Sequence, residues 1–218
     1  MNNFLNKEIK LCLSPINYLF LLFSSMFIIP SYPVYVNIFY YCLSCFFIFN
    51  NAELNKDISY SMILPITKKQ IVKSRCILVI TYQIIAILLT IPFAILNHKL
   101  QPMGNNAGID VNFAAYGLIL IPLSVFNLIF FTMFYKKAEK PGFPFLIASI
   151  SYWICYLILE FPIFIKNLLN IDFINKLDSV DFYPAVHLPV LGCGIIVFIV
   201  CWIITYSVSA KRFEKADL

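Results

Sequence analysis

The chain has 218 residues, of which 61% are hydrophobic, 17% are aromatic and only 12% are charged, and its mean hydropathy is +0.85. Soluble domains carry about 25% charged residues, so this chain lacks the polar side chains needed to cover its surface in water. The composition excludes a soluble globular domain. It predicts an all-α, polytopic membrane protein that forms a single transmembrane domain over residues 1–218.

The net charge of +5 does not predict a nucleic-acid partner, because Lys and Arg occur only in short segments between apolar runs. The seven cysteines lie within or beside these runs, which favours small buried hydrophobes over disulfides or a metal site. Cys42 and Cys45 form a CxxC without a second pair or a nearby histidine, so we interpret this pair as packing.

The N-terminal segment NNFLNKEIKLCLSP has the pattern of a short amphipathic helix. Its apolar face contains Phe4, Leu5, Ile9 and Leu13, opposite Lys7, Glu8 and Lys10. We expect this helix to lie flat in the membrane interface before Pro15 turns the chain into the bilayer. The alternative is a frayed terminus. The first apolar run lacks a basic lead and a small-residue cleavage site, so no signal peptide is expected.

Six apolar runs have lengths that suit the roughly 30 Å hydrocarbon core. They are Ile16–Pro30, Pro33–Phe49, Cys76–Leu96, Phe113–Phe134, Pro144–Ile165 and Pro189–Ser209. The first two form a tight hairpin around SYP. Thirteen of the 16 Lys and Arg residues fall on the side that holds both termini and the 50–75 loop. The positive-inside rule therefore predicts that this side is cytoplasmic.

The 50–75 loop contains DISYSMILPITKKQIVKSR, which divides at Pro65. Asp57 is the predicted N-cap of a short helix over Ile58–Leu64, which Pro65 ends. One apolar face of this helix is formed by Tyr60, Ile63 and Leu64, and Ser61 lies between them. A compact apolar turn of this kind suits docking into a groove on a partner.

After the proline, Thr67 and Gln70 have capping-box spacing, while Ile66 and Ile71 have hydrophobic-staple spacing. A second helix is predicted to start at Thr67 and to continue through the third span. Its length of about 45 Å exceeds the bilayer core, so its first turns project into the cytoplasm.

Lys68 and Lys69 occupy the first turn of this second helix, where a cation opposes the helix macrodipole by about 0.3–1 kcal/mol. Helix stability therefore does not explain them. Two explanations stay open: membrane topology with lipid headgroups, or an acidic surface on a partner.

The loop resembles the first cytoplasmic loop of the type-2 ABC exporter permease family, in its small bacterial members. The matching residues are Asp57, Tyr60, Ser61, Leu64, Pro65, Ile66, Thr67, Lys68, Lys69, Gln70, Ile71, Val72 and Arg75. The six-span layout and the basic C-terminal segment SAKRFEKADL are similar as well. The resemblance covers nearly the whole chain in layout, but only about 20 residues carry a motif.

The resemblance implies a non-catalytic permease subunit in a bacterial plasma membrane, paired with a second permease copy or a paralogue. Ile58–Leu64 would be the coupling helix against a separate cytoplasmic ABC ATPase, and Thr67–Arg75 would be the lever into the third span. This chain has no GxxxxGK[ST] loop. No cofactor is expected on it, since ATP and Mg would bind to the partner.

Glu160 is the only ionisable residue within a predicted span. It lies about 24 Å from the cytoplasmic end of its helix, in the outer third of the core. Ionisable groups inside membranes are usually functional or paired, so Glu160 is a candidate for a substrate path or gate. The alternative is an interfacial, locally neutralised carboxylate. In the outer loop 166–188 we predict a solvated acidic cap rather than a metal site.

The sequence also bears on two other classes of protein. An intramembrane enzyme needs catalytic pairs within the spans, whereas His98 and His187 lie outside them and Glu160 stands alone. A stand-alone secondary carrier or channel would show several midplane polar groups and broken helices in two repeats. Neither pattern is present, but this class remains the alternative.

Overall fold

The computed structural model describes residues 2–29, 31–63, 65–100, 105, 107–166 and 171–216, with side chains from Lys7 onward. Every regular element in these ranges is a helix, as predicted. In chain order they are α1 (Asn2–Cys12), α2 (Pro15–Leu22), the 3-10 helix η1 (Phe23–Ile28), α3 (Val34–Leu54), α4 (Asp57–Ile63), α5 (Lys68–Leu100), α6 (Phe113–Lys137), α7 (Gly142–Phe164), α9 (Asp172–Leu177) and α10 (Pro184–Glu214).

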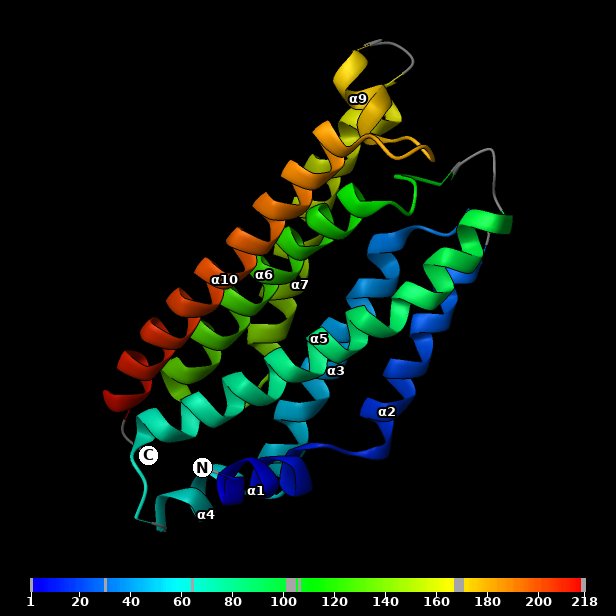
Figure 1. The fold of residues 1–218 in the computed structure, drawn as a ribbon. Coiled ribbons are helices and arrows are strands. Elements are labelled where there is room, and N and C mark those ends of the chain that lie inside the picture. Colours follow the sequence, from blue (N-terminus) through cyan, green and yellow to red (C-terminus); the bar gives the residue numbers. More distant parts are fainter. Residues whose placement is uncertain are drawn as a thin grey trace.

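The long helices run side by side, with α1, α4 and both termini at one end of the bundle and α9 at the other (Figure 1). Among the described residues, five helices are long and apolar enough to cross a membrane: α3, α5, α6, α7 and α10. The 8-residue α2 and the 6-residue η1 replace the first predicted span. Together they extend about 24 Å, short of a full crossing. Pro30 lies outside the described residues. The sixth span and the cytoplasmic side of the termini stay predictions.

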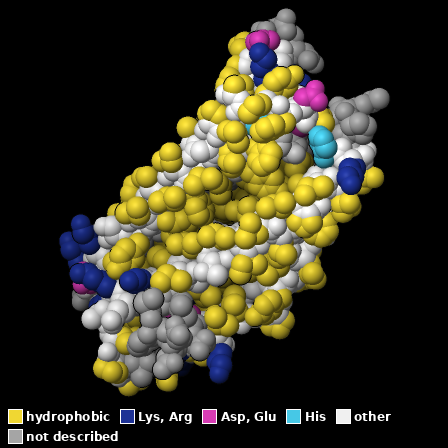
Figure 2. All heavy atoms as spheres, viewed as in Figure 1, with side chains coloured by type: hydrophobic (Ala, Val, Ile, Leu, Met, Phe, Trp, Pro, Cys, Tyr) yellow, Lys and Arg dark blue, Asp and Glu magenta, His cyan; other side chains and the backbone are white. Residues whose placement is uncertain are grey.

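The surface of the bundle has the polarity of a membrane protein. Hydrophobic side chains cover its long middle part, and the charged side chains on this face gather at the two ends (Figure 2). Helix α7 is the least enclosed of the five long helices, since only 17% of its most apolar 18-residue stretch is buried. Lipid or another protein surface must therefore cover most of α7.

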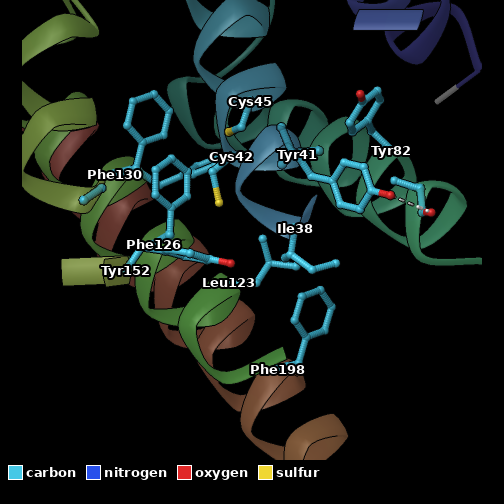
Figure 3. Close-up of a cluster of buried hydrophobic side chains, with 14 of the residues drawn as sticks. Ile38, Tyr41, Cys42, Cys45, Tyr82, Leu123, Phe126, Phe130, Tyr152 and Phe198 are labelled. Atoms are coloured by element: carbon cyan, nitrogen blue, oxygen red, sulfur yellow. Dashed lines mark hydrogen bonds between the residues drawn. The ribbon is translucent and has the colours of Figure 1, made fainter. Parts of the chain in front are cut away.

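The interior is built mainly from aromatic and aliphatic side chains of α3, α5 and α6 (Figure 3). Buried polar side chains there bond across helices, as apolar surroundings require. Gln83 of α5 and Asn127 of α6 exchange two hydrogen bonds of 2.9 Å. Asn17 of α2 donates to Ser44 of α3, and its carbonyl accepts from the Tyr82 hydroxyl at 2.8 Å. These pairs fix the relative depth of four helices.

Helices α6 and α10 form the most extensive contact of the bundle, and two glycines allow it. A Cβ on Gly194 would lie 2.1 Å from the Gly117 carbonyl oxygen, and one on Gly117 would lie 2.4 Å from the Val190 carbonyl oxygen. Small residues at such a crossing let two backbones meet. Gly192, two residues from Gly194, faces open space.

Replacing Gly194 with alanine is therefore expected to destabilise the protein by about 1–3 kcal/mol, because overpacking forces α6 and α10 apart. The matched Gly192→Ala change should be neutral or slightly stabilising, since alanine is the better helix former. Thermal melting of the two variants in mild detergent tests this. Equal melting temperatures would show that the close approach of α6 and α10 at Gly194 is not needed for stability.

Candidate functional site

Helix α4, the predicted coupling helix, has two chemically different faces. Tyr60, Met62 and Ile63 are 53%, 42% and 84% exposed, although all three are apolar or largely apolar. Asp57 and Ser61 are fully buried on the opposite face. Ile58 is partly buried and packs against the core. The predicted apolar face is thus present at Tyr60 and Ile63, while Leu64 lies outside the described residues and Pro65 is exposed.

The buried face of α4 belongs to an ionic network that joins three helices. The Arg75 guanidinium of α5 donates to Glu8 of α1 through Nε at 2.7 Å and to Asp57 of α4 through Nη2 at 2.6 Å. Lys7 of α1 forms an ion pair with Asp57 at 2.7 Å and donates to Ser61. We call these four charged residues, Lys7, Glu8, Asp57 and Arg75, the ionic joint.

The ionic joint is balanced and enclosed. It holds two cations and two anions, and the side chains of Glu8, Asp57 and Arg75 are at most 3% exposed. The Arg75 guanidinium also lies 5.2 Å from the centre of the Phe49 ring, where a cation–π contact adds to its stability. Removing one partner of a buried ion pair is strongly destabilising because the other charge stays unpaired. The joint therefore holds α1, α4 and α5 together.

Glu8, Cys12 and Asp57 place potential metal-ligand atoms within 4.8 Å of one another. Two observations speak against a metal there. Lys7 and Arg75 already supply the positive charge, and burial raises the pKa of the Cys12 thiol far above its usual range. The protonated thiol donates to Glu8 at 3.4 Å, so we interpret Cys12 as part of the joint's packing.

The start of α5 follows the predicted local pattern. The Thr67 backbone N–H donates to Gln70 Oε1 at 2.9 Å, and the Gln70 N–H donates to Thr67 Oγ1 at 3.3 Å. This is the predicted capping box. Ile71 is buried, and Ile66 packs against the core. Helix α5 then continues for 33 residues, about 50 Å, and so connects Arg75 directly to the apolar part of the same helix.

Lys68 and Lys69 have partners within this chain, which neither explanation from the sequence anticipated. Lys68 donates to the Ala216 carbonyl at 2.7 Å, and Lys69 pairs with Glu214 at 3.1 Å. Both contacts lie at the C-terminal end of α10, where cations complement the helix dipole. Nearby, the buried Phe213 ring lies 5.2 Å from that of Tyr135. These contacts clamp the start of α5 to the end of α10.

Two details of the sequence prediction need correction. Asp57 is the first residue of α4 rather than its N-cap, because its carboxylate is drawn to Lys7 and Arg75. Helix α1 forms as predicted, but Glu8 does not lie on a solvated face and is 1% exposed. The side chains of Phe4 and Leu5 lie outside the described part. The sequence does contain one indication of the ionic joint. Glu8 is the only acidic residue before Glu53, and a lone acid in an apolar segment calls for a cationic partner.

A small hollow lies beside α4. Its lining includes Ala52 from α3, Ile58 from α4, Arg75 from α5 and Tyr135 from α6, and its rim holds Lys56 and Glu139. The ionic joint forms part of its floor through Arg75. A side chain from a docked partner that enters this hollow would contact the joint directly.

Glu160, the second predicted site, lies at the opposite end of the bundle. It is 1% exposed, and its Oε1 accepts the backbone N–H of Ile109 at 2.7 Å. The next residue, Asp110, donates its N–H to Asp178 at 2.8 Å, and Asp178 pairs with Lys166. The backbone of Gly108, at a φ of +150°, passes so close to Glu160 that a Cβ would lie 2.1 Å from Oε1. The 107–112 segment is thus folded over Glu160.

The predicted solvated acidic cap of the outer loop is present in part. Asp172 and Asp181 are exposed, whereas Asp178 is 6% exposed. In the neighbouring loop, burial raises the pKa of the Asp110 carboxyl above its usual value. His187 is fully buried, and its Nε2 lies 2.8 Å from the Lys176 carbonyl oxygen. His187 is therefore a packing residue of this end of the bundle.

These features define a multi-pass membrane protein with a short, partly apolar helix anchored at one end of its bundle. The chain belongs to the ABC-2 family of transporter proteins, since the model of that family matches residues 3–214. This match confirms the resemblance drawn from residues 57–75 and identifies a membrane component of a transporter. No curated protein and no solved structure matches the chain.

Proposed function

We propose that this chain is the permease subunit of an ABC exporter, which moves a hydrophobic or amphipathic substrate outward. The ATP is hydrolysed, with Mg, by a separate ABC ATPase that docks on cytoplasmic loop 50–75. The functional unit contains a second permease copy or a paralogue. The observation that carries the proposal is α4, which exposes Tyr60 and Ile63 while its other face is fixed by the ionic joint.

Because the ionic joint ties α4 to α1 and α5, a movement of the docking surface is passed on to those helices. A movement imposed on α4 acts on Asp57, which pulls on Arg75 of α5 and on Lys7 of α1 at the same time. The clamp from Lys68 and Lys69 to α10 extends the movement to the last long helix. ATP-driven closure of the ATPase subunits therefore reaches α1, α5 and α10 through polar contacts on one end of the bundle.

The docking role is tested by copurification of an ABC ATPase with the tagged chain from its native cells. Changing Tyr60 and Ile63 to aspartate should weaken the complex by about 30-fold or more for each residue, since a buried apolar anchor contributes at least about 2 kcal/mol. Lys73→Asp is the matched control, because it changes the net charge by the same two units at an exposed position of α5. It should leave most of the ATPase bound.

Loss of the ATPase from the double variant but not from the control would support the docking surface. If no ATPase accompanies the wild-type chain while it stays folded in detergent, the alternative, a stand-alone carrier or channel, is favoured. In that case α4 would serve as a topological anchor.

A further inference from the structure

An aromatic stripe runs along the contact between α3 and α7. The Phe46 and Phe145 rings contact each other at a centroid distance of 4.8 Å, tilted by 42°, and the Phe39 ring lies 5.1 Å from that of Trp153. Five rings of the stripe are only partly buried, those of Phe39, Phe46, Phe145, Trp153 and Tyr156. The stripe thus follows the least enclosed helix of the bundle and is open to a molecule in the membrane.

The outer end of the stripe leads to Glu160. Trp153 and Tyr156 have ring centroids 5.5 Å apart, and the Tyr35 ring lies 4.8 Å from that of Tyr156. Tyr156 and Glu160 are one turn apart on α7, so they share a face of that helix. Tyr35, whose ring contacts Tyr156, therefore lies on the same side of α7 as Glu160.

Two side-chain oxygens in this group of α3 and α7 residues are buried without a hydrogen-bond partner among the described residues. They are Glu160 Oε2 and the Tyr35 hydroxyl, and both side chains are 1% exposed. Buried polar atoms are normally paired, so each unpaired one calls for an explanation. Here two such atoms, one from α3 and one from α7, belong to residues that adjoin the Tyr156 ring.

The charge at this end is unbalanced. Glu160, Asp110 and Asp178 are held together through the consecutive backbone N–H groups of Ile109 and Asp110. Within the described ranges, Lys166 is the only lysine or arginine that pairs with any of them, and it pairs with Asp178. The exposed His98 of α5 also acts on Asp110. Glu160 Oε1 accepts the Ile109 N–H, whereas Glu160 Oε2 has no hydrogen-bond donor in the described part of the chain.

We propose that Tyr35, Trp153, Tyr156 and Glu160 form a recognition site for a protonated amine carried on a hydrophobic body. The amine donates to Glu160 Oε2 and bonds to the Tyr35 hydroxyl, and the rings hold it by cation–π attraction, the arrangement by which proteins bind ammonium groups. The apolar body of the ligand lies along the stripe. This inference rests on the proposed exporter function and names the class of its substrate as cationic amphipaths.

The site is tested with dansylcadaverine, a fluorescent amphipath that ends in a primary amine, and with its N-acetylated, uncharged form. Binding to the purified chain in maltoside detergent is followed by energy transfer from Trp153 to the dansyl group. A Trp202→Phe background leaves Trp153 as the remaining tryptophan, because the chain has two. Tight binding of the amine, and weak binding of the acetylated form, is expected.

Glu160→Gln keeps the size of the side chain and an acceptor for Ile109, so it removes the charge alone. It should weaken binding of the amine by about tenfold or more, as expected for a lost charge-assisted hydrogen bond. Tyr35→Phe should weaken it several-fold. Asp172→Asn is the matched control, since it removes an exposed carboxylate at the same end of the bundle and should leave binding unchanged.

Equal affinity of the wild type and Glu160→Gln for the amine would overturn the proposal. Equal affinity of the wild type for the amine and its acetylated form would also overturn it, and this comparison needs no variant that must fold. The assay uses no ATPase. An amine site can therefore fail while the ATPase still docks on α4, and the reverse outcome is equally distinguishable.

Discussion

Replacing Arg75 with methionine is expected to lower the free energy of unfolding by about 3–5 kcal/mol, the range for removal of one partner from a buried ion pair. Methionine fills much of the space next to Phe49, so the loss is electrostatic rather than a cavity effect. Glu8 then loses its Arg75 partner, and Asp57 keeps Lys7 and the Ser61 hydroxyl. Thermal melting of the purified chain, followed by size-exclusion chromatography, measures the loss.

Lys73→Met provides the matched control, because Lys73 is an exposed cation two residues earlier in α5. It should melt like the wild type. A triple variant with Arg75→Met, Glu8→Gln and Asp57→Asn should recover most of the lost stability. It removes the three fully buried charges together, which is often nearly neutral, and the Lys7 side chain that stays is 15% exposed. A single Arg75→Met variant as stable as the triple variant would contradict the joint.

The parts of the structure that depend on local spacing could be predicted from the sequence. Thr67 and Gln70 are three residues apart, and their capping box is fixed by that spacing alone. The long helices follow from apolar runs that match the thickness of a bilayer. Glu160 was found because a lone carboxylate in an apolar helix is costly and therefore conspicuous.

The contacts that tie α4 and α5 to other helices could not be predicted in the same way. Arg75 and Glu8 are 67 positions apart, and Lys68 and Ala216 are 148 positions apart. Sequence patterns assign each of these residues to a helix face, but they do not show which helices meet. For the same reason Glu8 was placed on a solvated face, although tertiary packing buries it against α5.

In the proposed exporter, different residues of α4 bind the ATPase and pass its movement on to the bundle. Tyr60 and Ile63 offer the surface that a partner would contact, whereas Asp57 faces away from it into the bundle. An ATPase can therefore bind to α4 whether or not α4 is tied to α5. This predicts that the two properties are lost in different variants.

Asp57→Asn is expected to uncouple the complex. The amide removes the charge that holds both Lys7 and Arg75 to α4, while Arg75 keeps Glu8, so the chain stays folded. Loss of charged hydrogen bonds of this kind is worth about 1.5–3 kcal/mol each, enough to free α4 from α5. The ATPase should still copurify and hydrolyse ATP, but ATP should no longer change the fluorescence of Trp153 and Trp202 in α7 and α10.

Glu53→Gln is the control for this variant, because Glu53 is an exposed acid just before α4 and its change alters the net charge equally. It should keep the ATP-dependent fluorescence change. If Asp57→Asn also keeps that change, force must pass from α4 to the bundle by another route. The remaining routes are the partly buried Ile58 and the hollow shared with Ala52 and Tyr135.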